Sequence, residues 1–338
     1  MKKELDFYIA LQGCYKPEDY IRFGKLIESE GFDRIYVYDD LMFYPSFPIL
    51  NLIAEHTSRI EVGPCLVNGF YRHPALIASN AAFLDTLSHG RSVLGLGRGA
   101  FFDFLEMNDD EEFTRKGFRE TMLLIRHLFE QNGRAFNGEI FKASSKAILR
   151  VDPPVNPYII SATWNPEMAY LGGLYSNEVQ LAEVFTDSYF GQMYESFQKG
   201  CNESADGEEK YISLGGMICV ADDATKAIEK AKLTLSVYIP YLKTILKQHD
   251  VDVNSRLLME IDFESKRGNY AGASKLIPDE FVSMLTLSGT PSDVAARLKR
   301  LINGKSVKGI MFSPPYGISD SLEENIRYLS QNLLPKLQ

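Results

Sequence analysis

Two adjacent carboxylates, Asp39 and Asp40, follow a predicted strand over residues 33–38 and form the most polar group at any predicted strand end. A carboxyl group whose pKa is raised by burial can hold or accept a proton during catalysis. Carboxylates in this position also cap helices and loops, and that alternative stays open for at least one of the pair. Asp39 and Asp40 are therefore the candidate catalytic residues.

Other kinds of chemistry have little support in the sequence. The His, Cys, Asp and Glu residues do not cluster at metal-ligand spacing, so no metal site is predicted, and there is no nucleophile elbow. Gly95, Gly97 and Gly99 lack the spacing of the dinucleotide fingerprint and follow the third or fourth strand instead of the first. These glycines leave main chain open to a closely approaching ligand.

The elements around these residues alternate between strands and helices. Strands are predicted at residues 7–11, 33–38, 60–63, 92–96, 158–162, 179–184, 211–220 and 307–312, and helices at 18–30, 48–57, 74–90, 113–129, from 166, at 223–246 and from 291. This alternation predicts a parallel sheet with crossover helices, and its persistence over 338 residues favours a closed (β/α)8 TIM-like barrel. Residues 1–338 are read as one domain, with lid candidates at about 100–112 and 247–275.

The helix that begins near Pro74 has a predicted start and stop. Proline suits a first helical turn, and Gly90 supplies a left-handed residue at the other end. Arg72 and Arg91 flank this helix and are expected to pair with carboxylates such as Asp85.

In a barrel of this type the active site lies at the C-terminal ends of the strands. Besides the two aspartates, this rule selects Gln12, Cys14 and residues 65–68, 97–100, 161–165, 185–187 and 313–316. The aromatic residues Phe101, Phe102 and Phe104 follow the glycine-rich strand, where they form either core packing or an apolar wall beside a flat cofactor.

The amino-acid composition limits the kinds of molecule that the protein is expected to bind. Asp and Glu number 45 against 36 Lys and Arg, giving a net charge of −9, which provides no electrostatic footprint for nucleic acid or an anionic membrane. The four cysteines are widely spaced and fit a reducing compartment. The first residues are too few and too polar for a signal peptide or a membrane span. We expect a cytoplasmic protein with a small-molecule substrate.

Three motifs carry a family resemblance: Arg72-His73-Pro74-Ala75, then Leu84-Asp85-Thr86-Leu87-Ser88-x-Gly90-Arg91, then Leu94-Gly95-Leu96-Gly97-x-Gly99. They resemble the signature of the bacterial luciferase-like flavin-dependent oxidoreductases. Residues 289–298, Gly-Thr-Pro-Ser-Asp-Val-Ala-x-Arg-Leu, resemble the late motif of that family, so the similarity spans most of the chain. The resemblance implies a TIM-like barrel with an insertion, a homodimer, and FMN or the deazaflavin coenzyme F420 as cofactor.

Residues 63–74 are similar to the corresponding segment of F420-dependent methylenetetrahydromethanopterin reductases. That resemblance implies F420, with a cis peptide bond at Cys65-Leu66 behind the deazaflavin ring, and it places residues 161–165 where the family contacts the cofactor phosphate. The cofactor contacts expected on this basis are Asp39, Cys65, Leu66, Asn68, Gly97, Gly99, Ser161, Ala162, Thr163 and Trp164.

The chain departs from its relatives where they carry catalytic groups. Asp40 stands in place of a frequent histidine, and Ala100 and Ala10 stand where some relatives have acids. The leading hypothesis is hydride transfer between F420 and a small organic substrate, with Asp40 as acid or base. An FMN-dependent luciferase-like monooxygenase and a non-catalytic flavin-binding relative are the alternatives.

Overall fold

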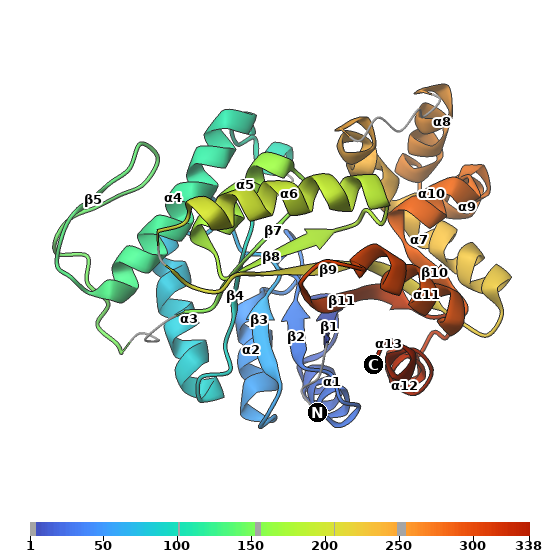
Figure 1. The fold of residues 1–338 in the computed structure, drawn as a ribbon, viewed down its shortest axis with the longest axis horizontal. Coiled ribbons are helices and arrows are strands. Elements are labelled where there is room, and N and C mark those ends of the chain that lie inside the picture. The colour runs from blue at the N-terminus through green and yellow to red at the C-terminus, as the bar shows by residue number, and fades with distance from the viewer. Residues whose placement is uncertain (1–4, 101, 153–156, 206, 249–254) are drawn as a thin grey trace.

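The computed structural model describes residues 5–100, 102–152, 157–205, 207–248 and 255–338. Within these residues, parallel strands follow one another in the order β3-β2-β1-β11-β9-β8-β7-β4 (Figure 1). Bridges from Val62 to Ser92 and from Val67 to Leu96 join β3 to β4 and close the ring. The predicted TIM-like barrel is confirmed. Its strands are β1 (Asp6–Leu11), β2 (Arg34–Val37), β3 (Glu61–Pro64), β4 (Leu94–Leu96), β7 (Ile159–Thr163), β8 (Glu178–Ala182), β9 (Tyr211–Val220) and β11 (Val307–Tyr316).

Helices surround the barrel and connect its strands (Figure 1). They are α1 (Pro17–Ser29), α2 (Ser46–Glu55), α3 (Pro74–Ser88), α4 (Glu111–Glu130), α5 (Pro166–Tyr175), α6 (Asp187–Glu203), α7 (Ala224–Gln248), α8 (Ser255–Lys266), α9 (Tyr270–Leu276), α10 (Asp279–Leu285), α11 (Pro291–Ile302), α12 (Leu322–Asn332) and α13 (Leu334–Leu337). A 3-10 helix η1 (Phe102–Leu105) and a small hairpin of β5 (Phe136–Asn137) and β6 (Lys142–Ala143) lie around α4. Among the described helices, none is both long enough and apolar enough to cross a membrane.

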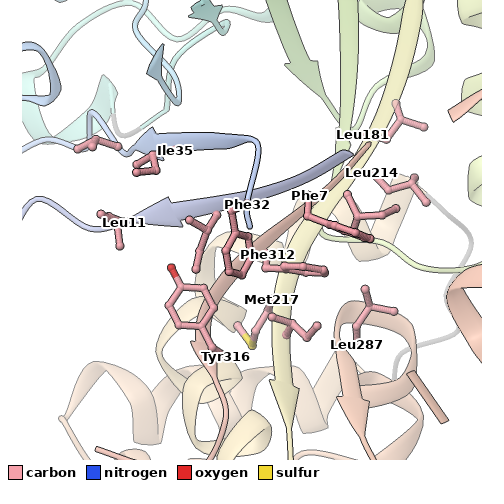
Figure 2. Packing of buried hydrophobic residues seen from close by; sticks show 14 of the residues in the cluster. Phe7, Leu11, Phe32, Ile35, Leu181, Leu214, Met217, Leu287, Phe312 and Tyr316 are labelled. Atoms are coloured by element: carbon pink, nitrogen blue, oxygen red, sulfur yellow. The ribbon is translucent and has the colours of Figure 1, made fainter. Parts of the chain in front are cut away.

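Alternate residues of the strands build two separate cores. Along β1, Phe7 and Ile9 join the large apolar cluster between strands and helices, whereas Tyr8 and Ala10 join a smaller cluster inside the barrel. Figure 2 shows the outer packing, in which the Phe7 ring stacks on Phe312 with centroids 6.2 Å apart. The period-two pattern thus separates the layer that holds the helices from the layer that lines the barrel.

Glycines allow β3 and β4 to approach at the seam of the barrel. A Cβ on Gly63 would lie 2.4 Å from the Val93 carbonyl oxygen, and one on Gly95 would lie 2.1 Å from the Pro64 carbonyl oxygen. Both contacts are shorter than side chains tolerate against backbone. Gly95 therefore serves the closure of the barrel, a role that the sequence reasoning assigned instead to ligand access.

Helix α3 begins at Pro74 as predicted, with the His73 ring accepting a hydrogen bond from the Ala75 amide. Its left-handed end is one residue earlier than expected, at His89 with φ 55°, and Gly90 follows with φ 81°. Asp85 accepts a hydrogen bond from Ser92 instead of pairing with an arginine.

Charged residues occupy the N-terminal end of the barrel interior. We call Arg34, Glu61, Glu178 and Lys308 the basal charge cluster. Arg34 is fully buried, donates to Glu178 at 3.1 Å and to Glu61 at 2.7 Å, and lies 4.2 Å over the Tyr8 ring. Burial would raise the pKa of Glu178, but Arg34 and then Lys308 outweigh burial and that pKa is lowered. This end of the barrel is closed by compensated charge.

An extension rises from the opposite end. Strands β9 and β11 are each 10 residues long, and the far part of β9 pairs with β10 (Leu287–Gly289), which lies outside the ring. Helices α7 to α10 lie between β9 and β10 in the chain and stand to one side of the barrel (Figure 1). We call residues 224–285 the helical extension. The lid candidate at 247–275 falls within it, although its residues 249–254 lie outside the described part of the chain, as does Phe101 of the candidate at 100–112.

Candidate active site

The C-terminal ends of the barrel strands bring a small group of polar side chains together. We call Gln12, Tyr38, Asp40, Leu66 and Glu183 the barrel mouth, and each is partly exposed. Gln12 follows β1, the next two follow β2, Leu66 follows β3, and Glu183 follows β8. Two hydrogen bonds tie the mouth together. One runs from Gln12 Nε2 to Asp40 Oδ2 at 2.9 Å, and the other from the Tyr38 hydroxyl to Ser313 Oγ at 2.6 Å.

The two predicted catalytic aspartates have different surroundings. Asp39 accepts hydrogen bonds from the Ser46 amide and hydroxyl through Oδ1, and Arg72 pairs with its Oδ2. This carboxylate therefore fixes the start of α2 and the loop after β3. The structure supports the capping alternative for Asp39, and it corrects the expected partner of Arg72 from Asp85 to Asp39.

Asp40 is the more available carboxyl group. Its side chain is partly exposed, and burial is the main cause that raises its pKa. The hydrogen bond from Gln12 opposes this shift, and the neighbouring charge of Asp39 adds to it. Asp40 can thus bind a substrate through a carboxyl group that takes up a proton more readily than an exposed aspartate.

Arg91 does not pair with a carboxylate as expected. Its guanidinium donates to the carbonyl oxygens of Ala54, Thr57, Ile60 and Ser88. These bonds tie α2 and the entrance of β3 to the end of α3. The arginine therefore holds the unit together through backbone acceptors.

The bulge after β3 has the conformation that the resemblance implied, because the peptide bond between Cys65 and Leu66 is cis. Cys65 is buried, its Sγ lies 4.0 Å from the Met311 sulfur, and burial raises the pKa of its thiol to about 12, with a further contribution from Asp40. The thiol therefore stays protonated and behaves as an apolar group. Together with the partly exposed Leu66, it gives the mouth an apolar side.

The glycines after β4 shape this bulge. A Cβ on Gly97 would lie 2.8 Å from Leu66 Cδ1, and one on Gly99, where φ is 97°, would lie 2.7 Å from the Phe102 ring. Asn68 is buried and accepts hydrogen bonds from the amides of Phe70 and Tyr71. Gly97, Gly99 and Asn68 therefore position the bulge and its loop.

The predicted phosphate-binding segment is only partly open to a ligand. Ser161 is fully buried, and its hydroxyl bonds that of Ser176 at 3.0 Å beneath α5, so we leave it out of the site. Thr163 Oγ1 accepts from the Asn165 amide, and Asn165 in turn caps α5. Ala162 and Trp164 are partly exposed at the strand end. The helix end carries a partial positive charge, although its own asparagine already occupies two of its amides.

The barrel and the loops at its strand ends agree with the family resemblance carried by the sequence motifs that begin just before α3. The family described as Luciferase-like monooxygenase matches residues 10–305 of the chain. The chain belongs to this family. The luciferase-like match covers every strand of the ring apart from part of β1 and all of β11.

Relatives of this luciferase-like chain extend over its whole length. The 5,10-methylenetetrahydromethanopterin reductase of Archaeoglobus fulgidus is 26% identical over 328 residues, which cover 96% of each chain. The coenzyme F420-dependent tetrahydromethanopterin reductase from Methanopyrus kandleri superposes with a TM-score of 0.87 at 22% identity, over 99% of this chain and 100% of that one. An F420-dependent secondary alcohol dehydrogenase in complex with an F420-acetone adduct gives 0.79 at 16% identity, with coverage of 99% and 100%.

Two residues at the C-terminal ends of the strands, Glu183 and Arg98, were not singled out individually from the sequence. Glu183 was placed inside a strand predicted to run to residue 184, whereas β8 ends at Ala182. Arg98 follows β4 and donates to Thr114 Oγ1 at 3.3 Å. The strand-end rule was the signal for both: it selected residues 97–100 as a block, and an earlier end for β8 would have selected Glu183.

Proposed function

We propose that this protein is an F420-dependent oxidoreductase that exchanges hydride between the deazaflavin and a small organic substrate. The observation that carries the proposal is the arrangement of the mouth. The apolar side formed by Cys65 and Leu66 is faced by the carboxyl groups of Asp40 and Glu183. A flat redox ring needs such an apolar surface, and proton exchange at the substrate needs a nearby acid. The F420-dependent relatives named above support the choice of cofactor.

The residues present fit the proposed cofactor. Leu66 offers an apolar contact, and Gly97 has no side chain that would displace Leu66. Inside the barrel, Gln180 donates from Nε2 to the Met311 sulfur at 3.2 Å, and its buried Oε1 has no hydrogen-bond partner among the described residues. That oxygen is an acceptor for a ring N–H or for a water.

The anionic part of F420 needs positive charge, and Arg98 supplies it. This guanidinium is partly exposed and lies on the loop after β4, which pairs with β7. The loop after β7 therefore lies beside it, and there we retain Ala162, Thr163 and Trp164 as proposed contacts. Asp39, Cys65, Asn68, Gly97 and Gly99 complete the proposed cofactor site, with Asp39, Asn68 and the glycines acting through the loops that they fix.

When bound, F420 supplies a carbon that accepts or gives a hydride. The chain positions the substrate beside that carbon, keeps water out and handles the proton. Asp40 reaches the mouth from β2, and its hydrogen bond to Gln12 orients the carboxyl group. It is the proposed substrate-binding carboxyl of the site.

Assembly and location form part of the proposal. We propose that the protein is cytoplasmic. We also propose that it is a homodimer, because the outer face of α3 presents Leu76 and Phe83 with 58% and 57% of their surface exposed. A second copy would cover these side chains. Light scattering of the purified protein should give twice the chain mass, and Phe83→Glu should shift it toward the monomer; a monomeric wild type would refute the dimer.

One titration tests the cofactor assignment. Purified protein is titrated separately with F420 and with FMN, and ligand fluorescence reports binding. We expect saturable quenching with F420 and little with FMN. Binding of FMN alone would overturn the proposal.

The family description itself favours one second candidate, an FMN-dependent monooxygenase. Oxygen uptake with reduced FMN that is absent with reduced F420 would select it. Tight binding of F420 without turnover on a broad panel of alcohols, aldehydes and cyclic imines would instead identify a flavin-binding relative without catalysis.

A further inference from the structure

We propose that Glu183 is the general acid–base of this site, the side chain that gives a proton to the substrate during reduction and takes one during oxidation. This inference rests on the proposed function and assigns the proton to the residue that directly follows β8, across the mouth from Asp40. Three features of the structure support it: the backbone at Glu183, the groups that surround it, and its position relative to the bulge.

The backbone holds Glu183 in an unusual conformation. Its φ is 67°, a left-handed value that residues other than glycine seldom adopt outside functional sites. The Glu183 amide donates to the Gly215 carbonyl at 3.0 Å, and the Val184 amide donates to that of Ala182 at 3.0 Å. A tight turn therefore ends β8 at this residue and points the chain in a new direction.

Neighbouring elements fix this turn from the outside. The Phe185 amide donates to the Met284 carbonyl at 2.8 Å, and the Phe185 ring packs so closely on Gly216 that a Cβ there would lie 2.8 Å from it. The same Cβ would lie 3.1 Å from the Glu183 amide nitrogen. The carboxyl group is thus carried by a rigid turn, as a group that must meet a reacting atom requires.

The groups that face Glu183 do not compensate its charge. They are Tyr38 from β2, Cys65 from the bulge, Tyr189 from α6 and Tyr238 from α7, and in each the pKa is raised, mainly by burial. All of these groups stay neutral around pH 7. In the described part of the chain no cationic side chain contributes to the pKa of Glu183.

The titration of Glu183 suits proton exchange at physiological pH. Burial raises its pKa to about 7, and a hydrogen bond from the Met217 backbone opposes the shift without cancelling it. An acid–base works best when its pKa lies near the working pH, because both forms are then populated. Asp40 shares Cys65 and Tyr238 as neighbours with Glu183, but its carboxylate keeps the hydrogen bond from Gln12.

The hydride and the proton leave the substrate separately. During oxidation the substrate C–H bond breaks with its electron pair, and that hydride passes to oxidised F420. The substrate O–H or N–H bond also breaks, its proton passes to a carboxylate oxygen of Glu183, and a C=O or C=N bond forms. During reduction the same bonds form in reverse, with the proton supplied by the Glu183 carboxyl group.

The first experiment needs no cofactor. Infrared titration of the carboxyl C=O band is compared in the wild type, Glu183→Gln, Asp40→Asn and Glu195→Gln. Glu195 is an exposed glutamate on α6 and gives a matched control. We expect one protonated carboxyl that titrates near pH 7 in the wild type, remains in Asp40→Asn and Glu195→Gln, and is lost only in Glu183→Gln. A band that survives in Glu183→Gln would overturn the assignment.

The second experiment uses F420 and the member of the alcohol and imine panel that the wild type turns over fastest. We expect Glu183→Gln to lower kcat by roughly 10²–10⁴-fold and to abolish the limb of the pH profile near 7. The kcat of Glu183→Asp should lie between those of the wild type and Glu183→Gln. The F420 affinity of each variant should stay within about twofold of the wild-type value. Thermal unfolding confirms that each variant is folded.

The F420 assignment and the role of Glu183 can be refuted separately. If F420 does not bind the wild type, the proposed function is wrong. If F420 binds and Glu183→Gln keeps the wild-type kcat or the pH limb near 7, the assignment of Glu183 is wrong while the proposed function stands.

Discussion

Strand β8 carries a glutamate at each end of the barrel, and the two behave in opposite ways. Glu178, its first residue, is fully buried beside Arg34 and has a lowered pKa. Glu183, directly after its last residue, faces neutral tyrosines and a thiol and has a pKa raised to about 7. A glutamate at the start of β8 is therefore a permanent anion at the base, and a glutamate directly after β8 is a titrating acid at the mouth.

The difference shows how this fold separates stability from chemistry. At the base Glu178 and Glu61 both pair with Arg34, which costs desolvation but compensates the buried charge. At the mouth the fold gives up that compensation and leaves carboxyl groups poised to exchange protons. Breaking the pairing at the base should therefore destabilise the protein, whereas removing the Glu183 carboxyl at the mouth should stabilise it at high pH.

The largest effect is expected at the base. Arg34→Met leaves Glu178 buried without its partner and should destabilise the protein by about 3–5 kcal/mol, measured by urea unfolding. The double variant Arg34→Met/Glu178→Gln removes both charges and should recover much of that loss. Equal losses in the single and double variants would contradict the role of the pair.

The second effect is a pH dependence of opposite sign at the two ends. The folded-state pKa of Glu183 lies above its ordinary value of 4.5, so its contribution to stability is complete below about pH 4.5 and is lost as the pH rises through about 7. Glu183→Gln should therefore become more stable than the wild type by about 3 kcal/mol at pH 8, relative to the difference between them at pH 4. Chemical denaturation at both pH values measures this.

Glu178 gives the matched comparison. Its lowered pKa means that its contribution is present above 4.5 and is lost as the pH falls below that value. Glu178→Gln should therefore cost stability at pH 7 and cost less at pH 3. If both glutamate variants showed the same pH trend, the contrast between the two ends would be refuted.

A smaller effect concerns Arg98 on the loop after β4, which donates to the Thr114 hydroxyl, whereas Arg34 pairs with carboxylates. Arg98→Gln should weaken F420 binding by about tenfold, equivalent to about 1.4 kcal/mol, because a charge-assisted contact to the anionic cofactor is lost. Fluorescence titration at low and high salt measures it, and the loss should shrink at high salt. Arg119→Gln on the exposed face of α4 is the control, and an equal loss there would argue against a specific contact.

The smallest effect is expected at the bulge. A Cβ on Gly97 meets the movable end of the Leu66 side chain, so Gly97→Ala should cost under about 1 kcal/mol of stability while lowering F420 affinity severalfold. Gly95→Ala meets the Pro64 backbone instead and should cost more, roughly 1–3 kcal/mol. Thermal unfolding and cofactor titration separate the two variants, and equal stability losses would count against this distinction.

The parts of the fold that local patterns encode could be predicted from the sequence. Strand and helix periodicity predicted the barrel, and Pro74 marked the start of α3. The cis bond at Cys65-Leu66 followed from family resemblance and was present. Each of these features depends on residues close together in the chain.

The parts that depend on distant partners could not be predicted. Arg34 meets Glu178 from 144 residues away, and Arg72 meets Asp39 from 33 residues away, so their pairing follows only from the closed ring. Glu183 was missed because the apolar run continues through Val184 and Phe185, which hides the turn that ends β8. Periodicity cannot detect a strand end that lies inside an apolar run.

The place of the helical extension in the chain affects how this enzyme can evolve. It interrupts the chain between β9 and β10, while the bulge, the glycines after β4 and the loop after β7 all precede it. Tyr238 on α7 lies close enough to Asp40 and Glu183 for both carboxyl groups to contribute to raising its pKa, after burial. Insertions, deletions or whole-segment exchange within residues 224–285 can therefore alter which substrates enter while the cofactor side stays unchanged, so new specificities can arise here without rebuilding the redox site.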